Sequence, residues 1–259
     1  MRKDKRSPLK ASPLRLPGQS LHKYREDQIY DYVLTPFFLA LFGLVLAGLE
    51  WFRWYTGMPP EPKLYTVCAV LLVTYAVIAI RRTWPRLRAL KQARDGERAV
   101  GQQLEELRKQ GFQVLHDIVG DEFNIDHVLI GPAGVFTIET KTISKPVRGD
   151  PKISFDGQSI SIAGAQLTRN PVIQAKAQAR WLKDLIAQST GRTVEVWPVV
   201  VFPGWYVEHA AGAHKEIWVL NPKGLPSFLA QEPVRLTPED VQLVTYHLSQ
   251  YVRQSANKK

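Results

Sequence analysis

The sequence predicts an α/β protein, with a mixed sheet flanked by helices, preceded by a transmembrane helical hairpin. Two apolar segments, residues 33–52 and 64–80, lie near the start of the chain. Beyond them, short β-branched runs are interleaved with segments of helical periodicity, in the order helix, several strands, helix, two strands, helix. That order is typical of helices packed on a sheet, and the 45% hydrophobic content allows a packed core.

The two apolar segments are each close to the about 20 residues that cross a bilayer as a helix. Aromatic residues gather at the end of the first segment, as they do at a membrane interface: Trp51, Phe52, Trp54 and Tyr55. Two buried helices of a soluble core are the alternative, but the apolar residues run all round each helix. A cleaved signal peptide is disfavoured because a second apolar segment follows at once.

Positive charges predict the orientation of this hairpin. Lysine and arginine residues crowd the flanks of the two segments, whereas only Arg53 and Lys63 lie between them. The positive-inside rule therefore predicts a multi-pass protein of the inner (plasma) membrane, with both termini and the soluble domain in the cytoplasm. The net charge of +10 also fits an anionic partner, either membrane lipid or nucleic acid. With Cys68 as the single cysteine, an intrachain disulfide and a cysteine-based zinc site are excluded.

Composition divides the chain into five predicted parts. These are a disordered basic cytoplasmic arm (1–31), two transmembrane helices (32–80), a basic linker or helical extension (81–94), a soluble domain (95–205) and a C-terminal extension with a strand and a helix (206–259).

The soluble region begins near Asp95 with a helix whose Val100, Leu104 and Leu107 share one face, and Gly111 is expected to end it. Strands are expected at 114–118, on both sides of a turn at 131–134, near 152–156 and 159–163, and at 194–202 and 216–220. Two further helices are expected where an N-cap residue precedes proline, at Asn170–Pro171 and Thr237–Pro238.

The hairpin around Gly131–Gly134 carries charged residues inside apolar runs. If Ile130 pairs with Val135, Asp126 falls opposite Glu139 and Asn124 falls opposite Lys141, while the other face carries Ile125, Leu129 and Ile138 and packs inward. Because side chains alternate along a strand, Glu139 and Lys141 share a face. Two opposed carboxylates need a proton or a cation between them.

Oxygen ligands of this kind favour a hard ion such as Mg²⁺, which uses one or two carboxylates together with water and substrate phosphate. Lys141 lies where it could orient or deprotonate an attacking water, or stabilise the charge of a phosphoryl transition state. The cluster therefore suits metal-assisted phosphodiester hydrolysis. An ordinary solvated group of ion pairs is the alternative that the hairpin alone leaves open.

Two more polar residues lie on otherwise apolar helix faces. Glu97 precedes Val100 and Leu104 on the first helix, where it either benefits from the helix dipole at an exposed first turn or reaches into a site. Gln174 shares a face with Gln178 and could bind a phosphate or a water, although packing at the edge of the core also explains it.

Taken in order, these motifs resemble the NERD (nuclease-related) domain of the PD-(D/E)xK restriction-endonuclease-like superfamily. The resemblance covers about residues 95–205 and rests on GERAVGQQLEEL, GFQVLHDI, NIDHVLIGPAGVFTIETKT and NPVIQAKAQARWL. One departure from the superfamily's name is that Ile125, rather than proline, precedes the first acid. The resemblance implies a restriction-endonuclease-like mixed sheet flanked by helices, with the hairpin at its centre.

The resemblance also implies site roles. Asp126 and Glu139 are the expected metal ligands, Glu97 an additional acid, Lys141 the catalytic lysine and Gln174 the polar residue of the later helix. The expected protein is a membrane-anchored nuclease that uses Mg²⁺ or Mn²⁺ and acts on DNA or RNA, with DNA favoured. It contacts the phosphate backbone through basic residues: Lys145, Arg148, Lys152 and Arg169. A catalytically silent module that tethers nucleic acid or a protein to the membrane is the alternative. The sequence indicates no oligomeric state.

Overall fold

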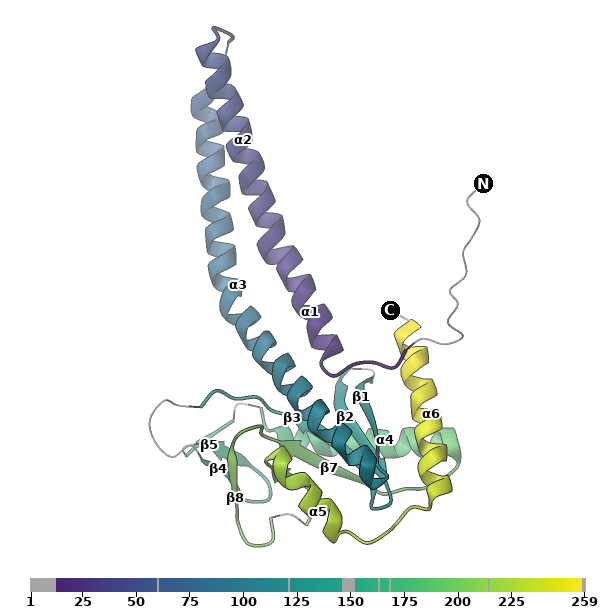
Figure 1. The fold of residues 1–259 in the computed structure, drawn as a ribbon. Coiled ribbons are helices and arrows are strands. Elements are labelled where there is room, and N and C mark those ends of the chain that lie inside the picture. The colour runs from purple at the N-terminus through teal and green to yellow at the C-terminus, as the bar shows by residue number, and fades with distance from the viewer. Residues whose placement is uncertain are drawn as a thin grey trace, which may run out of the picture. The chain divides into compact units, whose positions relative to one another are not determined.

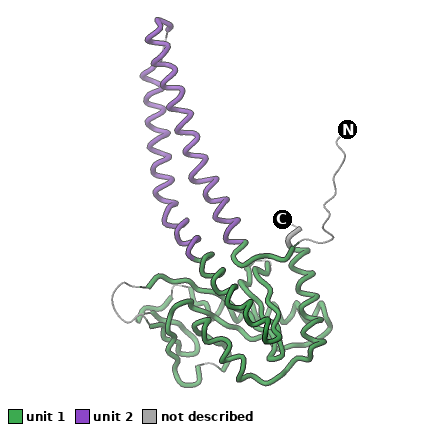
Figure 2. The backbone as a smooth tube through the Cα atoms, viewed as in Figure 1, with its two compact units in different colours: residues 1–19, 93–259 green, residues 20–92 purple. Residues whose placement is uncertain are grey.

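A computed structural model of the chain describes residues 13–59, 61–120, 122–145, 152–162, 164–167, 169–213 and 215–257. The chain divides into two compact units, residues 20–92 and residues 93–259 together with the segment before residue 20 (Figure 2). The first twelve residues of the predicted disordered arm lie outside the described part of the chain.

The unit formed by residues 20–92 is helical. Its elements are α1 (Gln19–Ile29), a π-helical stretch (Tyr30–Leu34), α2 (Thr35–Tyr55) and the first part of α3 (Pro62–Glu105), up to residue 92. Residues 19–55 and 62–110 form two helices that are long and apolar enough to cross a membrane. Residues 19–29, for which the sequence indicated disorder, are helical because they extend a helix that is already nucleated by the apolar segment after them.

Small residues line the contact between α2 and α3. Ala40, Gly43 and Ala47 are buried, and a Cβ atom on Gly43 would lie 2.7 Å from the Leu72 side chain. Large apolar side chains of both helices are exposed instead, among them Phe42 and Leu71. Close packing through small residues with bulky residues outside is the pattern of helices that face lipid.

The larger sheet of the other unit confirms the predicted mixed α/β fold (Figure 1). Its strand order is β1 (Gln113–Val119), β2 (Asn124–Gly131), β3 (Gly134–Thr140), β7 (Val196–Val201) and β9 (Trp218–Leu220). The pairs β1–β2 and β2–β3 are antiparallel, while β3–β7 and β7–β9 are parallel. Every residue of β3 is buried, so this strand lies at the centre of the sheet and packs on both faces.

Helices cover both faces of this sheet. On one face, Val100 and Leu104 of α3 and Leu225 of α5 (Leu225–Gln231) pack against Leu129 and other sheet residues. On the other face, α4 (Pro171–Thr190) and α6 (Pro238–Asn257) bury a second cluster against β1, β2 and β3. Both predicted caps are present, since Asn170 accepts from Val172 N–H at 3.0 Å and Thr237 from Asp240 N–H at 3.2 Å.

A second, smaller mixed sheet was not predicted as a separate layer. Its order is β6 (Ala165–Gln166), β5 (Ile160–Ile162), β4 (Lys152–Phe155) and β8 (Tyr206–His209). Ile153, Phe155 and Val207 pack with Val172 and Ala175 near the start of α4. The region after residue 205 therefore completes both sheets through β8 and β9 and adds helices α5 and α6.

Candidate active site

The hairpin of β2 and β3 pairs as the sequence predicts, with Ile130 opposite Val135. The sequence placed Asp126 directly opposite Glu139, whereas the paired register stops one residue earlier, at His127 and Ile138. Two carboxylates in direct opposition would repel each other, and β2 and β3 form no further backbone pair beyond this point.

Beyond the last pair, the Asp126 side chain takes the place of a backbone acceptor for β3. Its Oδ2 accepts a hydrogen bond from the Thr140 N–H at 2.7 Å. Lys141, which the sequence placed opposite Asn124, instead donates its backbone N–H to Val201 O of β7 at 2.9 Å. The end of β3 is thus fixed by a carboxylate on one side and by a parallel strand on the other.

The Lys141 ammonium lies between two elements. It donates to Glu139 Oε1 at 2.6 Å and to Gln174 Oε1 of α4 at 3.2 Å. Gln178, one turn further along α4, donates from Nε2 to Glu139 Oε2 at 2.7 Å and to Asn124 O at 2.9 Å. Both oxygens of the buried Glu139 carboxylate therefore accept hydrogen bonds, and the rotamers of Glu139 and Lys141 are defined.

Glu97 reaches the same region from α3 and is only 8% exposed. The helix comes close because Gly96 has no side chain: a Cβ atom there would lie 1.8 Å from Thr142 Oγ1. Burial, followed by the charges of Asp117 and Glu139, raises the pKa of Glu97 to about 8. The exposed first-turn reading of Glu97 is wrong, because residue 97 lies deep inside the continuous helix α3.

Asp117 is an acidic residue of this cluster that the sequence did not indicate. It lies in β1 with a left-handed backbone (φ 51°), between the β1–β2 pairs His116–His127 and Ile118–Ile125. Its buried carboxylate accepts from Arg15 Nε at 2.8 Å and forms an ion pair with Arg15 Nη2 at 2.6 Å. The segment before residue 20 thus supplies a cation next to the acidic residues.

The same irregularity changes the faces of β2. Ile125 was expected to share a face with Leu129 and Ile138, but it packs in the cluster beneath α4 and α6, whereas the other two pack beneath α3 and α5. The left-handed residue Asp117 interrupts the alternation at that position of the ladder. His127 is fully buried, and its Nδ1 lies 2.9 Å from Nδ1 of His116.

Burial dominates the electrostatics of the cluster. The pKa of Asp126 is well above its usual range, mainly because of burial and then because of the charges of Glu139 and Glu97, which outweigh the Thr140 N–H. A nearby cation stabilises the ionised form of a carboxyl group whose pKa is raised in this way. In the described part of the chain, no three histidine, cysteine, aspartate or glutamate side chains form a ready-made metal group. An ion here would be held by one or two carboxylates with water and a ligand.

The comparison with protein families agrees with the position of this cluster. Residues 92–203 match the model of the NERD family, the nuclease-related domain. The NERD segment thus contains Glu97, Asp126, Glu139, Lys141 and Gln174. No curated protein and no solved structure gave a significant match to the chain.

All five residues singled out in the sequence lie within one region of the NERD segment, linked by contact or by charge. Three others were missed: Arg15, Asp117 and Gln178. Gln178 could have been found from its place one turn after Gln174 on the same helix face. For Arg15 and Asp117 the sequence carries no local signal, because their contact joins residues 102 positions apart.

Proposed function

We propose that the chain is a membrane-anchored, divalent-metal-dependent nuclease that hydrolyses phosphodiester bonds of nucleic acid on the cytoplasmic side of the inner (plasma) membrane. The observation that carries the proposal is the grouping of Asp126, Glu139 and Lys141 at the end of the central strands, inside the segment that matches the nuclease-related domain. In such a group, the carboxylates can bind a metal ion and the ammonium group can contact a phosphate.

The residues present fit Mg²⁺ or Mn²⁺. The donors are oxygen atoms, burial and neighbouring acids raise the pKa values of Asp126 and Glu97, and the Asp126 side chain keeps some exposure to solvent. Asp126 and Glu139 would hold the ion, with Glu97 as a third acid. A bound divalent ion supplies Lewis-acid stabilisation of the charge that develops on a phosphoryl group.

The side chains around the acids have roles of their own. Lys141, 30% exposed, is placed to orient a water and to offset negative charge in the transition state. Gln174 fixes the ammonium by accepting from it, and Gln178 fixes the Glu139 carboxylate by donating to it. Gln174 and Gln178 are positioning residues, since each acts through a partner.

The membrane hairpin would hold this site near the lipid surface. Residues 19–55 and 62–110 have the length and apolarity to span, and the basic flanks favour a cytoplasmic domain. Lys145, Lys152 and Arg169 would contact the phosphates of DNA, the expected substrate, whereas Arg148 lies outside the described residues. Such contacts carry no sequence information and weaken as salt concentration rises.

A silent tethering module is the second candidate. It is favoured by one observation: both Glu139 oxygens are already occupied, by Lys141 and by Gln178. A site that remained closed in this way would bind nucleic acid through its basic residues and cut nothing.

A cleavage assay separates the two candidates. The purified chain in detergent micelles is incubated with plasmid, linear and single-stranded DNA and with RNA, in Mg²⁺, Mn²⁺ or EDTA, beside Glu139→Ala. Metal-dependent cutting that is lost in Glu139→Ala supports the nuclease and names its substrate class. Binding without cutting in every metal supports the tether.

A further inference from the structure

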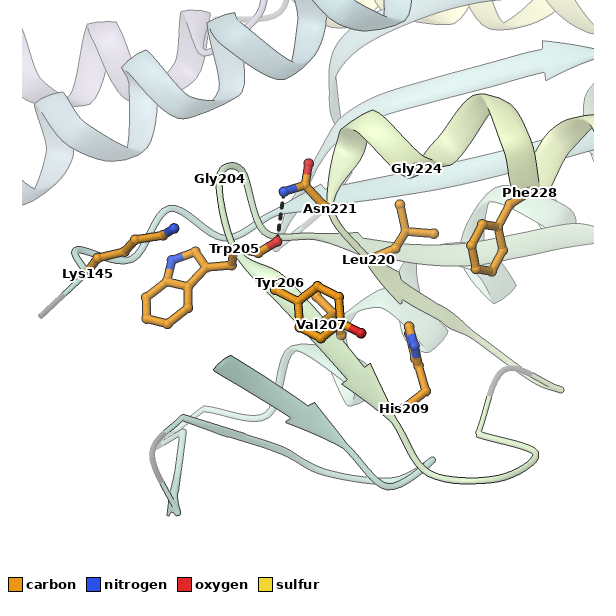
Figure 3. A pocket seen from close by; sticks show the side chains of 10 residues that line it. All are labelled: Lys145, Gly204, Trp205, Tyr206, Val207, His209, Leu220, Asn221, Gly224 and Phe228. Atoms are coloured by element: carbon orange, nitrogen blue, oxygen red, sulfur yellow. Dashed lines mark hydrogen bonds between the residues drawn. The ribbon is translucent and has the colours of Figure 1, made fainter. Parts of the chain in front are cut away.

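A hollow of about 460 Å³ lies beside β8, outside the acidic cluster. Figure 3 shows Lys145 and the Trp205 indole at one end, Phe228 at the other end and the Tyr206 ring between them. The volume is within the range of small-molecule binding sites, about 300–1,000 Å³. The lining therefore combines aromatic rings with a cation.

Tyr206 is the most informative residue of this hollow. Its side chain is 66% exposed, whereas the neighbours Trp205 and Val207 are buried. As the first residue of β8, Tyr206 is in register with Lys152 of β4, which is also exposed. A large ring kept in solvent beside lysine residues is the arrangement that proteins use to stack unpaired bases.

The floor of the hollow is fixed before any ligand binds. Trp205 Nε1 donates to Ile143 O at 3.0 Å, and Asn221 Nδ2 donates to Trp205 O at 2.7 Å. The Lys145 ammonium lies 5.6 Å from the centre of the Trp205 ring, a cation–π distance. A preformed floor reduces the entropy that a ligand loses on binding.

The hollow is also within reach of the acidic cluster. Lys145 follows Lys141 by four residues, so their Cα atoms are at most about 14 Å apart. That span corresponds to about four steps of a stacked nucleic-acid strand, at roughly 3.4 Å each. A single strand of about four nucleotides is long enough to cover that distance.

We propose that the hollow binds an unpaired nucleotide of the nucleic-acid substrate, with its base stacked on Tyr206 and its phosphate near Lys145. The proposal rests on the proposed function, and it names single-stranded segments as the preferred substrate class. A base inside a duplex has both faces stacked on its neighbours and cannot offer one to a tyrosine ring. A strand with free bases gains the ring contact as well as the phosphate contact.

Equilibrium binding tests the proposal. The full chain in detergent micelles is titrated into a fluorescent single-stranded DNA oligonucleotide, and separately into its duplex, in EDTA so that no cleavage occurs. Tyr206→Ala should weaken single-strand binding by about 5- to 150-fold, which corresponds to about 1–3 kcal/mol for one stacked base. Tyr206→Phe should bind like the wild type, because the ring remains. Tyr246→Ala is the matched control, since Tyr246 is 61% exposed on α6.

Three outcomes would overturn the proposal: unchanged single-strand affinity in Tyr206→Ala, an equal loss in Tyr246→Ala, or no single-strand binding by the wild type. The proposed nuclease activity is read separately, as cleavage by the same protein in Mg²⁺. Loss of binding in Tyr206→Ala without any wild-type cleavage would keep the stacking site and reject the nuclease. Cleavage by the wild type together with full binding by Tyr206→Ala would keep the nuclease and reject the stacking site.

Discussion

The Lys141 ammonium donates to Glu139 Oε1 at 2.6 Å; Glu139 lies in β3, and Lys141 directly follows the last residue of that strand. Alternation along the strand places both side chains on the same face, and Gln174 holds the ammonium from α4 at 3.2 Å. The geometry of the Glu139–Lys141 pair therefore depends on both β3 and α4.

Replacing Gln178 with leucine should destabilise the domain. The change leaves Glu139 Oε2 without its donor in a carboxylate that is 3% exposed, and such a loss costs about 1–3 kcal/mol. Chemical unfolding followed by tryptophan fluorescence measures it. Gln174→Leu is the control, because Gln174 is exposed and should change the free energy of unfolding by much less. Equal effects of the two changes would count against the assigned role of Gln178.

Divalent ions should raise the thermal stability of the wild type, because a ligand that binds only the folded state stabilises it. Asp126→Asn should remove the increase in Tm with Mg²⁺ or Mn²⁺ while it retains an oxygen that can accept from Thr140 N–H. Thermal unfolding with added metal or EDTA provides the measurement. An Asp126→Asn protein that still responds fully to metal would place the ion elsewhere.

The free energy of unfolding in EDTA should fall as pH rises from about 5 to about 8. Burial raises the pKa of Glu97 from 4.5 to about 8, so the unfolded chain loses this proton first and the folded chain keeps it. The stability that the protonated group provides is complete below pH 4.5 and is lost as pH rises through about 8. One such group contributes a slope of about 1.4 kcal/mol per pH unit.

Glu97→Gln should reduce that slope, as measured by urea unfolding at several pH values. Glu216→Gln is the control, because Lys176 lowers the pKa of the exposed Glu216, whose carboxyl is therefore ionised in both states over this range. A Glu97→Gln protein with the full wild-type slope would show that Glu97 does not retain its proton.

Gly96→Ala should destabilise the domain by about 1–3 kcal/mol through overpacking, since the new Cβ would overlap Thr142. The helix must move to relieve the contact, which also displaces Glu97, so any metal-dependent activity should fall. Gly224→Ala is the matched control, because a Cβ there meets nothing within 4 Å. Unfolding and activity measurements on both variants check the prediction, and equal stability of the two would contradict it.

The sequence predicted the parts of the site that depend on local rules. The turn at residues 131–134 sets the pairing of Ile130 with Val135, and strand alternation brings Glu139 next to Lys141. The caps at Asn170 and Thr237 start helices that the structure contains. Each of these features is decided by residues a few positions apart, so a pattern in the chain is sufficient.

The missed parts depend on contacts between distant residues. The pair Arg15–Asp117 joins the segment before the two long apolar helices to β1, and no spacing rule links residues so far apart. Residues 81–94, predicted as a basic linker or a helical extension, are part of one helix, because α3 continues from Pro62 to Glu105 even through Pro85. The short strand β8 has too few residues for its alternation to stand out.

The proposed role of Lys141 in metal-dependent hydrolysis is tested by the cleavage activity of Lys141→Ala. Wild type and Lys141→Ala are compared in Mg²⁺ on the substrate that the wild type cuts, with thermal unfolding recorded for both. Lys141→Ala is expected to remain folded and to lose cleavage. A folded Lys141→Ala protein that cuts like the wild type would contradict it.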